Sequence, residues 1–475
     1  MALVIQADKI KNPSLKPTKP FAKHIFRAYD IRGLVDDELS VELYYNVGRG
    51  LGAVMREKKK KVILLGFDAR LSSYEFASSL SDGLQDSGID VISVGLVPSP
   101  VLYFAFGNLD CNSGVMVTGS HNPKEYNGIK MVVDGENLTS SDIEDLYFRI
   151  NEKRFYDGNA TYREIDVIPS YIQTIKDQIQ LQRPLKVVID CGNGVAGALA
   201  GNLFRGIGAQ VTELYCDVDG NFPNHHPDPS IPENMNCLSE LVQSQKFDIG
   251  LAFDGDADRL GVVTSKGEII WPDRQLICLA QSILKSNPGA AVVYDVKCSS
   301  LLEEAINNAG GKAIMSPTGH SVVKKAMRDN NALLAGEMSG HIFIKDNWSG
   351  FDDALYSAAR LLEILAKSPL RVEEQFALIP DSINTQELKV HVNEQQKFKL
   401  MSRIVDTWFF DEGRCLYIDG LRWQSNRGWG LVRASNTSPY LILRFEADNQ
   451  EDLIYIQNLF KARFKALDPT LRLPF

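Results

Sequence analysis

The sequence lacks any run of about 18 uninterrupted apolar residues, so a membrane-spanning helix is not expected. Its seven cysteines are odd in number and form no Cys-x-x-Cys pair, which argues against a disulfide framework or zinc ribbon. A net charge of -9 gives no overall attraction to a polyphosphate, so nucleic acid is not an expected partner. The apolar start at residues 1–5 is shorter than a secretory signal, and we expect a soluble, cytoplasmic protein with reduced thiols.

The composition of the chain also excludes two structural classes. With 36 glycines and 20 prolines among 475 residues and 44% hydrophobic residues, the chain is neither collagen-like nor disordered. This length has room for three or four domains of about 150 residues each. We therefore expect a multidomain globular protein.

One order of elements occurs three times along the chain: a strand, a helix, a second strand and a third strand. Strands that alternate with helices predict βαβ units with largely parallel sheets, and we interpret the recurrence as duplication. The helices include Ser72–Ser87 and Ser299–Asn308. The first strands are expected at Val62–Phe67, Val187–Ile189 and Val292–Tyr294, the second at Asp90–Gly95, Gln210–Tyr215 and Lys312–Met315, and the third at Gly114–Val117, Ile249–Phe253 and Ala332–Leu334.

The pattern changes after about residue 380, where the regular alternation ends and an α+β domain is expected. Its strands are expected at Leu388–Val392, Leu416–Leu421, Gly430–Arg433 and Tyr440–Glu446, and its helices at Gln396–Thr407 and Gln450–Ala466. The predicted fold class is α/β: three similar mixed α/β domains of duplicated βαβ units, plus a C-terminal α+β domain, around a central cleft. The expected domains are 1–165, 166–267, 268–380 and 381–475.

A polar loop follows the third strand of each repeated unit. The loops read TGSHNP at 118–123, DGDADR at 254–259 and GEMSGH at 336–341. Ligands of open α/β sheets bind at the carboxyl ends of the strands, so the loops are expected to converge on one cleft. The alternative is a chance recurrence, since βαβ units are common.

The acidic loop carries Asp254, Asp256 and Asp258, which share a face if the segment is extended. Three such carboxylates repel one another, so either a cation binds there or the loop is fully solvated. Oxygen ligands favour Mg²⁺ over zinc. An EF-hand is excluded, because its sixth and twelfth positions are Arg259 and Ser265 instead of Gly and Glu. A hard cation is the favoured interpretation.

The serine loop places Ser120 beside His121, which suggests a nucleophile and a base. The G-x-S-x-G elbow is absent, because Thr118 and Asn122 occupy the flanking positions. Adjacent residues of an extended segment point apart, so His121 is expected to be poorly placed as a base for Ser120, and acyl transfer is disfavoured. A phosphorylated Ser120 beside Mg²⁺ is chemically coherent, although the loop alone favours a turn residue.

Two further loops are rich in polar side chains. Glu337, Ser339 and His341 share a face if their segment is extended, which suits sugar hydroxyls, with a hydrogen-bonded turn as the alternative. Residues 433–438 combine Arg433 with hydroxyl, amide and backbone N–H donors, as a phosphate monoester requires. An ordinary hairpin turn is the alternative there.

A dinucleotide site is a rival interpretation of the second unit. Residues 192–197 match G-x-G-x-x-G after a predicted strand, and Glu213 lies where a ribose-binding acid is expected. The motif alone is weak, since helix–strand packing also requires glycine. The segment Asn224–Asp228, with two histidines, is a weak candidate for a zinc site, because such Pro-flanked loops are usually structural.

Together, the loops TGSHNP, DGDADR, GEMSGH and RASNTSP (433–439), in this order, closely resemble the α-D-phosphohexomutase superfamily, and within it the bacterial phosphomannomutase/phosphoglucomutase group. The segments FRAYDIRG (26–33) and TGH (318–320) fit as well, so the resemblance spans residues 26 to 446. One position departs from the pattern: Ala257 stands where the group usually has glycine. An aminosugar mutase is a nearby possibility, but its sugar loop typically differs at Met338.

The resemblance implies an interconversion of hexose 6-phosphate and hexose 1-phosphate, of mannose, glucose or both, through a phosphoserine and a hexose 1,6-bisphosphate. It implies a magnesium site of Asp254, Asp256, Asp258 and a phosphoserine oxygen at Ser120. Lys130, Arg259 and His341 would act near the transferring group. The expected ligand-contacting residues are Tyr29, Arg32, Lys297, His320, Glu337, Ser339, His341, Arg433, Ser435, Asn436 and Thr437.

The resemblance also bears on partners, motion and catalysis. The partners expected are small phosphosugars, with neither nucleic acid nor membrane, and the chain is expected to be a monomer or weak dimer. A mobile fourth domain would close the cleft over the substrate. A non-catalytic sugar-phosphate sensor is the remaining alternative to an enzyme, although every expected reactive side chain is present. The preferred hexose and the general base are left open.

Overall fold

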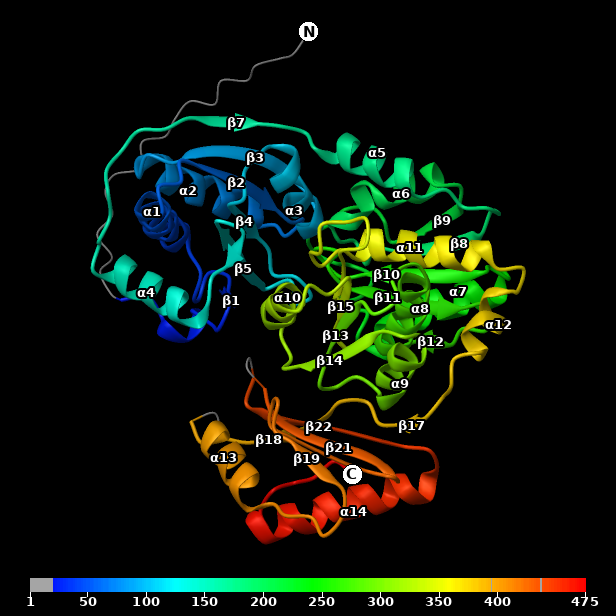
Figure 1. Ribbon diagram of the computed structural model, residues 1–475. Helices are drawn as coiled ribbons and strands as arrows, with labels where there is room; N and C mark the ends of the chain where they lie inside the picture. Colours follow the sequence, from blue (N-terminus) through cyan, green and yellow to red (C-terminus); the bar gives the residue numbers. More distant parts are fainter. Residues whose placement is uncertain (1–19, 394, 436–437) are drawn as a thin grey trace.

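The structure is a computed structural model that describes residues 20–393, 395–435 and 438–475. Four β-sheets follow one another along the chain, and each defines a unit with its own helices (Figure 1). No helix in the described part of the chain is both long and apolar enough to cross a membrane. The four units agree with the predicted fold class, three similar α/β units and a C-terminal α+β unit.

The first unit contains a seven-stranded sheet in the order β1-β5-β4-β2-β3-β7, with β6 on β5. Its strands are β1 (Asp30–Leu34), β2 (Val62–Phe67), β3 (Asp90–Leu96), β4 (Gly114–Val117), β5 (Tyr126–Val133), β6 (Glu136–Asn137) and β7 (Tyr162–Glu164). Its helices are α1 (Val41–Glu57), α2 (Ser73–Asp86), α3 (Ser99–Asn108) and α4 (Ser140–Asn151).

The second unit contains a five-stranded sheet in the order β12-β11-β10-β8-β9. Its strands are β8 (Lys186–Asp190), β9 (Gln210–Leu214), β10 (Ile249–Phe253), β11 (Leu260–Thr264) and β12 (Ile269–Ile270), and its helices are α5 (Ile168–Gln178), α6 (Ala200–Gly206) and α7 (Asn236–Ser244). β12 pairs antiparallel with β11 and is the last strand of this sheet along the chain.

The third unit contains a four-stranded sheet in the order β14-β13-β15-β16. Its strands are β13 (Ala291–Asp295), β14 (Lys312–Ser316), β15 (Leu334–Gly336) and β16 (Ile342–Ile344), and its helices are α8 (Pro272–Ser286), α9 (Ser300–Asn308), α10 (His320–Asp329), α11 (Ala354–Lys367) and α12 (Val372–Ala377). The strand expected at Ala332–Leu334 is wrong by two residues, because the paired segment runs on to Gly336, opposite Tyr294 and Ile342.

The first three sheets repeat one topology. In each, three consecutive strands recur, and the first of the three lies between the other two and is parallel to both, as in β3-β2-β4, β9-β8-β10 and β14-β13-β15. A fourth strand then pairs antiparallel with the third, as β5 does with β4. The sheets are therefore mixed and less uniformly parallel than expected. The three polar loops are the connections into these antiparallel strands.

The fourth unit is a six-stranded sheet, with the path β17-β22-β21-β20-β19 and β18 on β22. Its elements are β17 (Ile383–Asn384), β18 (Leu388–His391), α13 (Lys397–Thr407), β19 (Arg414–Leu416), β20 (Leu421–Ser425), β21 (Gly428–Ala434), β22 (Tyr440–Ala447) and α14 (Gln450–Leu467). The single strand expected at Leu416–Leu421 is wrong: the turn around Gly420, where φ is 79°, separates two antiparallel strands there.

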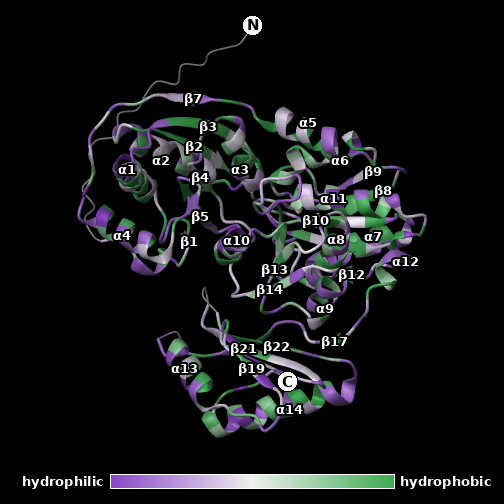
Figure 2. Ribbon diagram, viewed as in Figure 1, coloured by the Kyte–Doolittle hydropathy of each residue, from purple (hydrophilic) through white to green (hydrophobic). Residues whose placement is uncertain are grey.

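Buried apolar side chains join the first three units into one body. A single hydrophobic cluster runs from Leu64 and Val101 of the first unit through Leu203 of the second to Leu362 of the third. Figure 2 shows hydrophobic residues along the central strands and hydrophilic residues on outer helical surfaces. The fourth unit has its own core, which includes Trp423.

The fourth unit contacts the third through a small apolar cluster of Val296, Trp429 and Leu431 and through polar groups. The buried Arg422 guanidinium donates to the Cys298 carbonyl at 2.9 Å, and Ser300 Oγ donates to Glu446 Oε1 at 2.8 Å. In Figure 1 its sheet faces the other units, and α13 and α14 lie on the side away from them. Residues of all four units line one cleft.

Candidate active site

A cleft of about 900 Å³ is lined by residues from all four units. Most of the residues that the sequence predicted as ligand-contacting or catalytic line it, and they are Tyr29, Arg32, Ser120, Lys130, Arg259, Lys297, His320, Glu337, Ser339, His341, Arg433 and Ser435. Asn436 and Thr437 lie outside the described residues. The four loops therefore meet at one volume, as their positions after the strands predict.

The serine loop is held in a tight turn after β4. Ser120 has a positive φ of 48°, and its backbone N–H donates to Thr118 Oγ1 at 2.7 Å. The buried Arg70 guanidinium donates to the carbonyls of Ser120 at 2.7 Å and Tyr126 at 2.8 Å, while Asp68 accepts from Thr118. The sequence did not indicate a role for Asp68 and Arg70, because buried side chains that hold a loop distant in the chain form no local sequence pattern.

His121 contradicts the expectation from sequence. Its Nδ1 lies 3.1 Å from Ser120 Oγ, within hydrogen-bond distance. The expectation assumed an extended loop, but the left-handed backbone at Ser120 turns both side chains to one side. Burial, together with Arg259 and Arg32, lowers the pKa of His121 well below its ordinary value. The imidazole is therefore neutral, and its protonation is disfavoured.

The acidic loop brings its carboxylates together through a turn instead of an extended segment. Asp254 Oδ1 accepts from the backbone N–H groups of Asp258 at 3.0 Å and Arg259 at 3.1 Å. Ala257, the departure from the family pattern, has a positive φ of 60°, which explains the usual glycine there. The three aspartates offer oxygens within 4.8 Å of one another and are buried. Ser120 Oγ donates to Asp254 Oδ2 at 3.1 Å.

Lys130 supplies part of the counter-charge for these carboxylates. Its Nζ donates to Asp256 Oδ2 at 2.7 Å and to Asp258 Oδ2 at 2.5 Å. Although burial alone would lower it, Asp256 and Asp258 raise the pKa of Lys130 well above its ordinary value. Burial and the other two aspartates raise the pKa of Asp254 well above its usual range. His341, whose Nε2 lies 3.2 Å from Asp258 Oδ1, is a second group that can carry counter-charge at the cluster.

The residues present fit a hard divalent cation. The donors are carboxylate and hydroxyl oxygens, which Mg²⁺ prefers. Asp256 Oδ1 is buried and has no hydrogen-bond partner among the described residues, so it is an acceptor that still needs a cation or donor. Asp258, His341 and Asp352 form a second group with close ligand atoms, which shares Asp258 with the first.

The third polar loop, at residues 336–341, is called the sugar loop below. It forms a turn in which three side chains contact His341. Its Nδ1 lies 2.9 Å from Ser339 Oγ and 3.3 Å from Glu337 Oε2, and its Nε2 lies 3.2 Å from Asp258 Oδ1. The turn is formed by the Gly340 N–H donating to the Glu337 carbonyl, so the residues converge without the extended geometry considered from the sequence. His341 therefore links the sugar loop to the acidic loop.

Charges in the sugar loop stabilise one another. Burial would lower the pKa of His341, but Asp258 and Glu337 raise it to about 10. Burial would raise the pKa of Glu337, but His341 and Lys297 lower it to about 2. Glu337 Oε1 also accepts from the Gly319 N–H at 2.6 Å. Glu337 is thus an ionised acceptor at the centre of the cleft.

The early segment reaches the cleft beside the serine loop. Arg32 Nη1 donates to Asn122 Oδ1 at 2.6 Å, and its Nη2 pairs with Asp30 at 2.7 Å. The rings of Tyr29 and His320 meet edge to face with centroids 4.9 Å apart. Burial lowers the pKa of His320 to about 4, so this imidazole is neutral near pH 7.

Two acidic residues that the sequence did not indicate pair with basic side chains that line the cleft. Asp419 Oδ2 accepts from Arg433 Nε at 2.8 Å, and Glu387 Oε1 accepts from Lys297 Nζ at 2.6 Å. Asp419 lies beside Gly420 in the turn between β19 and β20, where the sequence had suggested a single strand. Glu387 immediately precedes β18. Both contacts depend on tertiary structure.

The glycines of residues 192–197 are explained by packing. A Cβ added at Gly194 would lie 2.9 Å from the Gly255 carbonyl, and one added at Gly197 would lie 2.0 Å from the Cys216 carbonyl. Glu213 pairs with Arg205 at 2.7 Å instead of facing the cleft. The loop therefore supports the acidic loop, which accounts for the motif without a dinucleotide.

The histidines of the segment Asn224–Asp228 lie apart from the candidate metal clusters of the described residues. His225 Nε2 lies 3.1 Å from both oxygens of Asp190, so this imidazole is held by a carboxylate. The segment is thus explained as a structural loop, and the described residues give no support to a zinc site there.

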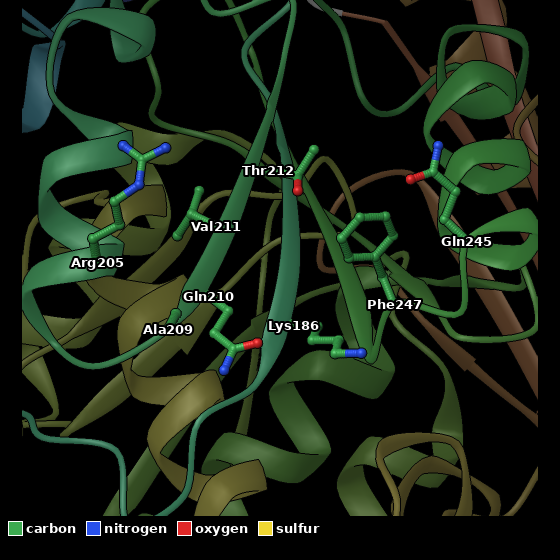
Figure 3. Close-up of a pocket in the computed structure, with 8 residues that line it drawn as sticks. All are labelled: Lys186, Arg205, Ala209, Gln210, Val211, Thr212, Gln245 and Phe247. Atoms are coloured by element: carbon green, nitrogen blue, oxygen red, sulfur yellow. The ribbon is translucent and has the colours of Figure 1, made fainter.

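A second hollow lies at the amino ends of β8 and β9. Figure 3 shows Lys186 and Arg205 among its lining residues. Within the described chain, that hollow contains none of the predicted site residues. Of these two cavities, only the large cleft is lined by described residues that the sequence predicted for the site.

Comparison with known proteins agrees with this geometry. Four family models match in order, described as Phosphoglucomutase/phosphomannomutase alpha/beta/alpha domain I (residues 23–157), domain II (169–267), domain III (271–381) and C-terminal domain (387–461).

Named relatives cover nearly the whole chain. A phosphomannomutase/phosphoglucomutase from Pseudomonas aeruginosa is 48% identical over 97% of this chain and 99% of its own length. A phosphoglucomutase from Neisseria gonorrhoeae is 49% identical over 93% and 96%. A crystal structure of a phosphoglucomutase/phosphomannomutase family protein from Burkholderia thailandensis has 44% identity and a TM-score of 0.92, over 96% of this chain and 100% of that one. The chain therefore belongs to the phosphoglucomutase/phosphomannomutase family.

Proposed function

We propose that this protein is a phosphohexomutase that interconverts hexose 6-phosphate and hexose 1-phosphate, with mannose, glucose or both as the sugar. The observation that carries the proposal is the 3.1 Å contact of Asp254 Oδ2 with the hydroxyl of Ser120, a residue that lines the cleft between all four units. A hydroxyl at that position is close to a cation site and faces a volume large enough for a sugar phosphate. The relatives' names support the same activity.

The proposed reaction begins with a phosphoryl group on Ser120 Oγ. The bond from phosphorus to this oxygen breaks as a new bond forms to the free hydroxyl of the hexose monophosphate, which gives a hexose 1,6-bisphosphate. The hydroxyl proton passes to a neighbouring base. The bisphosphate then reverses its orientation and returns its other phosphoryl group to Ser120, so phosphate and protons balance over the cycle.

Charge stabilisation at the transferring group falls to residues around Ser120. Asp254, Asp256 and Asp258, with an oxygen of the phosphoserine, would hold Mg²⁺, which when bound neutralises phosphoryl charge. Lys130 orients Asp256 and Asp258 through its ammonium group. Arg259 Nη2 lies 3.5 Å from His121 Nε2, and His121 Nδ1 lies 3.1 Å from Ser120 Oγ.

The remaining site residues are proposed to hold the sugar and its distal phosphate. Glu337 and Ser339 would bind sugar hydroxyls, and His341 would orient both of them and handle protons. The distal phosphate would meet Arg433 and Ser435 together with Asn436 and Thr437. Further contacts are proposed for Tyr29, Arg32, Lys297 and His320.

The cofactors and partners follow from this scheme. Mg²⁺ and a hexose 1,6-bisphosphate, as activator and intermediate, are the proposed cofactors. Small phosphosugars are the proposed partners of a cytoplasmic monomer or weak dimer that binds neither nucleic acid nor membrane. We propose domain limits at about residues 165, 267 and 380.

A coupled assay tests the proposal. Purified protein with Mg²⁺ and a trace of glucose 1,6-bisphosphate should convert mannose 1-phosphate or glucose 1-phosphate to the 6-phosphate. Ser120→Ala should abolish turnover, and EDTA should do so reversibly. Binding of the sugar phosphates without isomerisation would identify a sensor and refute the proposal.

A further inference from the structure

Two cysteines lie in contact at the carboxyl ends of neighbouring strands. In the parallel pairing of β8 with β9, Asp190 lies opposite Leu214, so Cys191 and Cys216 follow at the same edge of the sheet. Their Sγ atoms are 3.2 Å apart. Cys191 is fully buried and Cys216 is partly exposed. The two cysteines lie beside the segment that supports the acidic loop. They take no direct part in the proposed reaction.

We propose that Cys191 and Cys216 form a redox-active dithiol that closes to an intrachain disulfide and thereby weakens the magnesium site. Closure requires the sulfurs to approach from 3.2 Å to about 2.05 Å, a movement of roughly one ångström. Cys191 and Cys216 follow the ends of two neighbouring strands of one sheet, so their backbones are already near one another.

The oxidant is a low-molecular-weight disulfide such as oxidised glutathione. The Cys216 thiolate attacks one of its sulfurs, a mixed disulfide forms, and one glutathione thiolate leaves. The Cys191 thiolate then attacks the Cys216 sulfur and expels the second glutathione. Two protein thiols are oxidised, one glutathione disulfide is reduced to two thiols, and the two protons pass to the glutathione thiolates.

The surroundings assign different roles to the two cysteines. Cys216 is accessible to solvent and therefore to the oxidant. The hydrogen bond from Cys216, followed by burial, raises the pKa of Cys191 well above its ordinary value. Because its side chain is fully buried, Cys191 is shielded from outside reagents, and the Cys216 sulfur at 3.2 Å is the one within its reach. The expected sequence is attack by Cys216 and closure by Cys191.

The loop after Cys191 connects the pair to the metal site. The Gly194 N–H donates to the Cys191 carbonyl at 2.6 Å, and the Val195 N–H donates to the Gly255 carbonyl at 3.2 Å. Gly255 lies between two of the aspartates, and the packing at Gly194 leaves no space even for a Cβ. Movement of Cys191 toward Cys216 therefore displaces the support of the acidic loop. This consequence rests on the proposed metal site, whereas disulfide formation does not.

The first test maps the thiols of the folded protein after exposure to oxidised glutathione. Alkylation in denaturant followed by peptide mass analysis should show a Cys191–Cys216 linked peptide that dithiothreitol removes. Cys237→Ser, which removes an exposed thiol at α7, should retain the linked peptide, and Cys216→Ser should lose it. The proposal would be overturned if Cys191 stayed fully alkylatable while Cys237 was modified. This result is obtained with the wild-type protein, so it does not depend on the folding of any variant.

The second test measures the rise in melting temperature that Mg²⁺ causes. The rise should be smaller in the oxidised protein than in the reduced protein, and Cys216→Ser should show the same rise before and after exposure to the oxidant. An equal rise in a protein whose linked peptide has formed would overturn the coupling. No rise in the reduced protein would instead refute the proposed metal site, so the two failures are distinguishable.

Discussion

Replacement of Lys130 by methionine should make the stability of the protein depend strongly on Mg²⁺. The Lys130 ammonium contacts Asp256 at 2.7 Å and Asp258 at 2.5 Å, and all three side chains are at most 7% exposed. Loss of one partner of such a buried pair costs about 3–5 kcal/mol, because the remaining charges stay buried without compensation. Lys130→Met should therefore unfold at a clearly lower temperature in EDTA.

Magnesium should reverse much of this loss, because a dication at the aspartates supplies the missing positive charge. Thermal melts in EDTA and across a Mg²⁺ titration measure the effect in the wild type and the variant. The matched control is Lys23→Met, which breaks a surface pair with Glu144 whose side chains are 59% and 54% exposed. That change should cost at most about 1 kcal/mol and leave the Mg²⁺ response unchanged. If Lys130→Met and Lys23→Met melted alike with and without Mg²⁺, the electrostatic reasoning would be refuted.

Three further changes test other parts of the site. Glu387→Gln should free Lys297 to bind the phosphosugar, and steady-state kinetics should show a KM about two- to fivefold lower. The reason is that a partly exposed ion pair contributes up to about 1 kcal/mol. An unchanged KM would count against the role of Lys297. Arg433→Lys should raise the KM about tenfold or more with little change in kcat, because the planar fork is lost; equal kinetics would contradict a phosphate contact. Burial raises the pKa of Asp353 to about 7. Because the folded state holds this proton more tightly than the unfolded state, the stabilisation is complete below about pH 4 and is lost as pH rises through 7. The melting temperature of Asp353→Asn relative to wild type should thus increase between pH 5 and 8, and a constant difference would show that Asp353 is ionised throughout.

The repeated units could be predicted because strong local signals bound their strands. Gly114–Val117 and Ile249–Phe253 were expected at the residues where the structure has them. Each is a buried apolar run that ends abruptly in a polar loop, so both ends are marked in the sequence. The strand expected at Leu416–Leu421 failed, because the tight turn at Gly420 falls inside an otherwise strand-like segment.

The meeting of the loops could be predicted from their positions after the strands, but their internal geometry could not. Ser120 and Ala257 have a left-handed backbone, which local sequence does not indicate for either residue type. At Ser120 the turn is held by Arg70, which lies 50 residues earlier in the chain. Extended-segment reasoning therefore gave the correct grouping of the aspartates for the wrong reason, and it misplaced His121.

The most direct test of the proposed mechanism is the location of the phosphoryl group during turnover. Protein incubated with glucose 1,6-bisphosphate and Mg²⁺ is examined by intact mass and peptide mapping, before and after hexose 6-phosphate is added. The mechanism predicts one phosphoryl group on Ser120, which disappears from the protein as the added sugar becomes bisphosphate. Phosphate on a different residue, or isomerisation by a protein that never carries it, would contradict the mechanism.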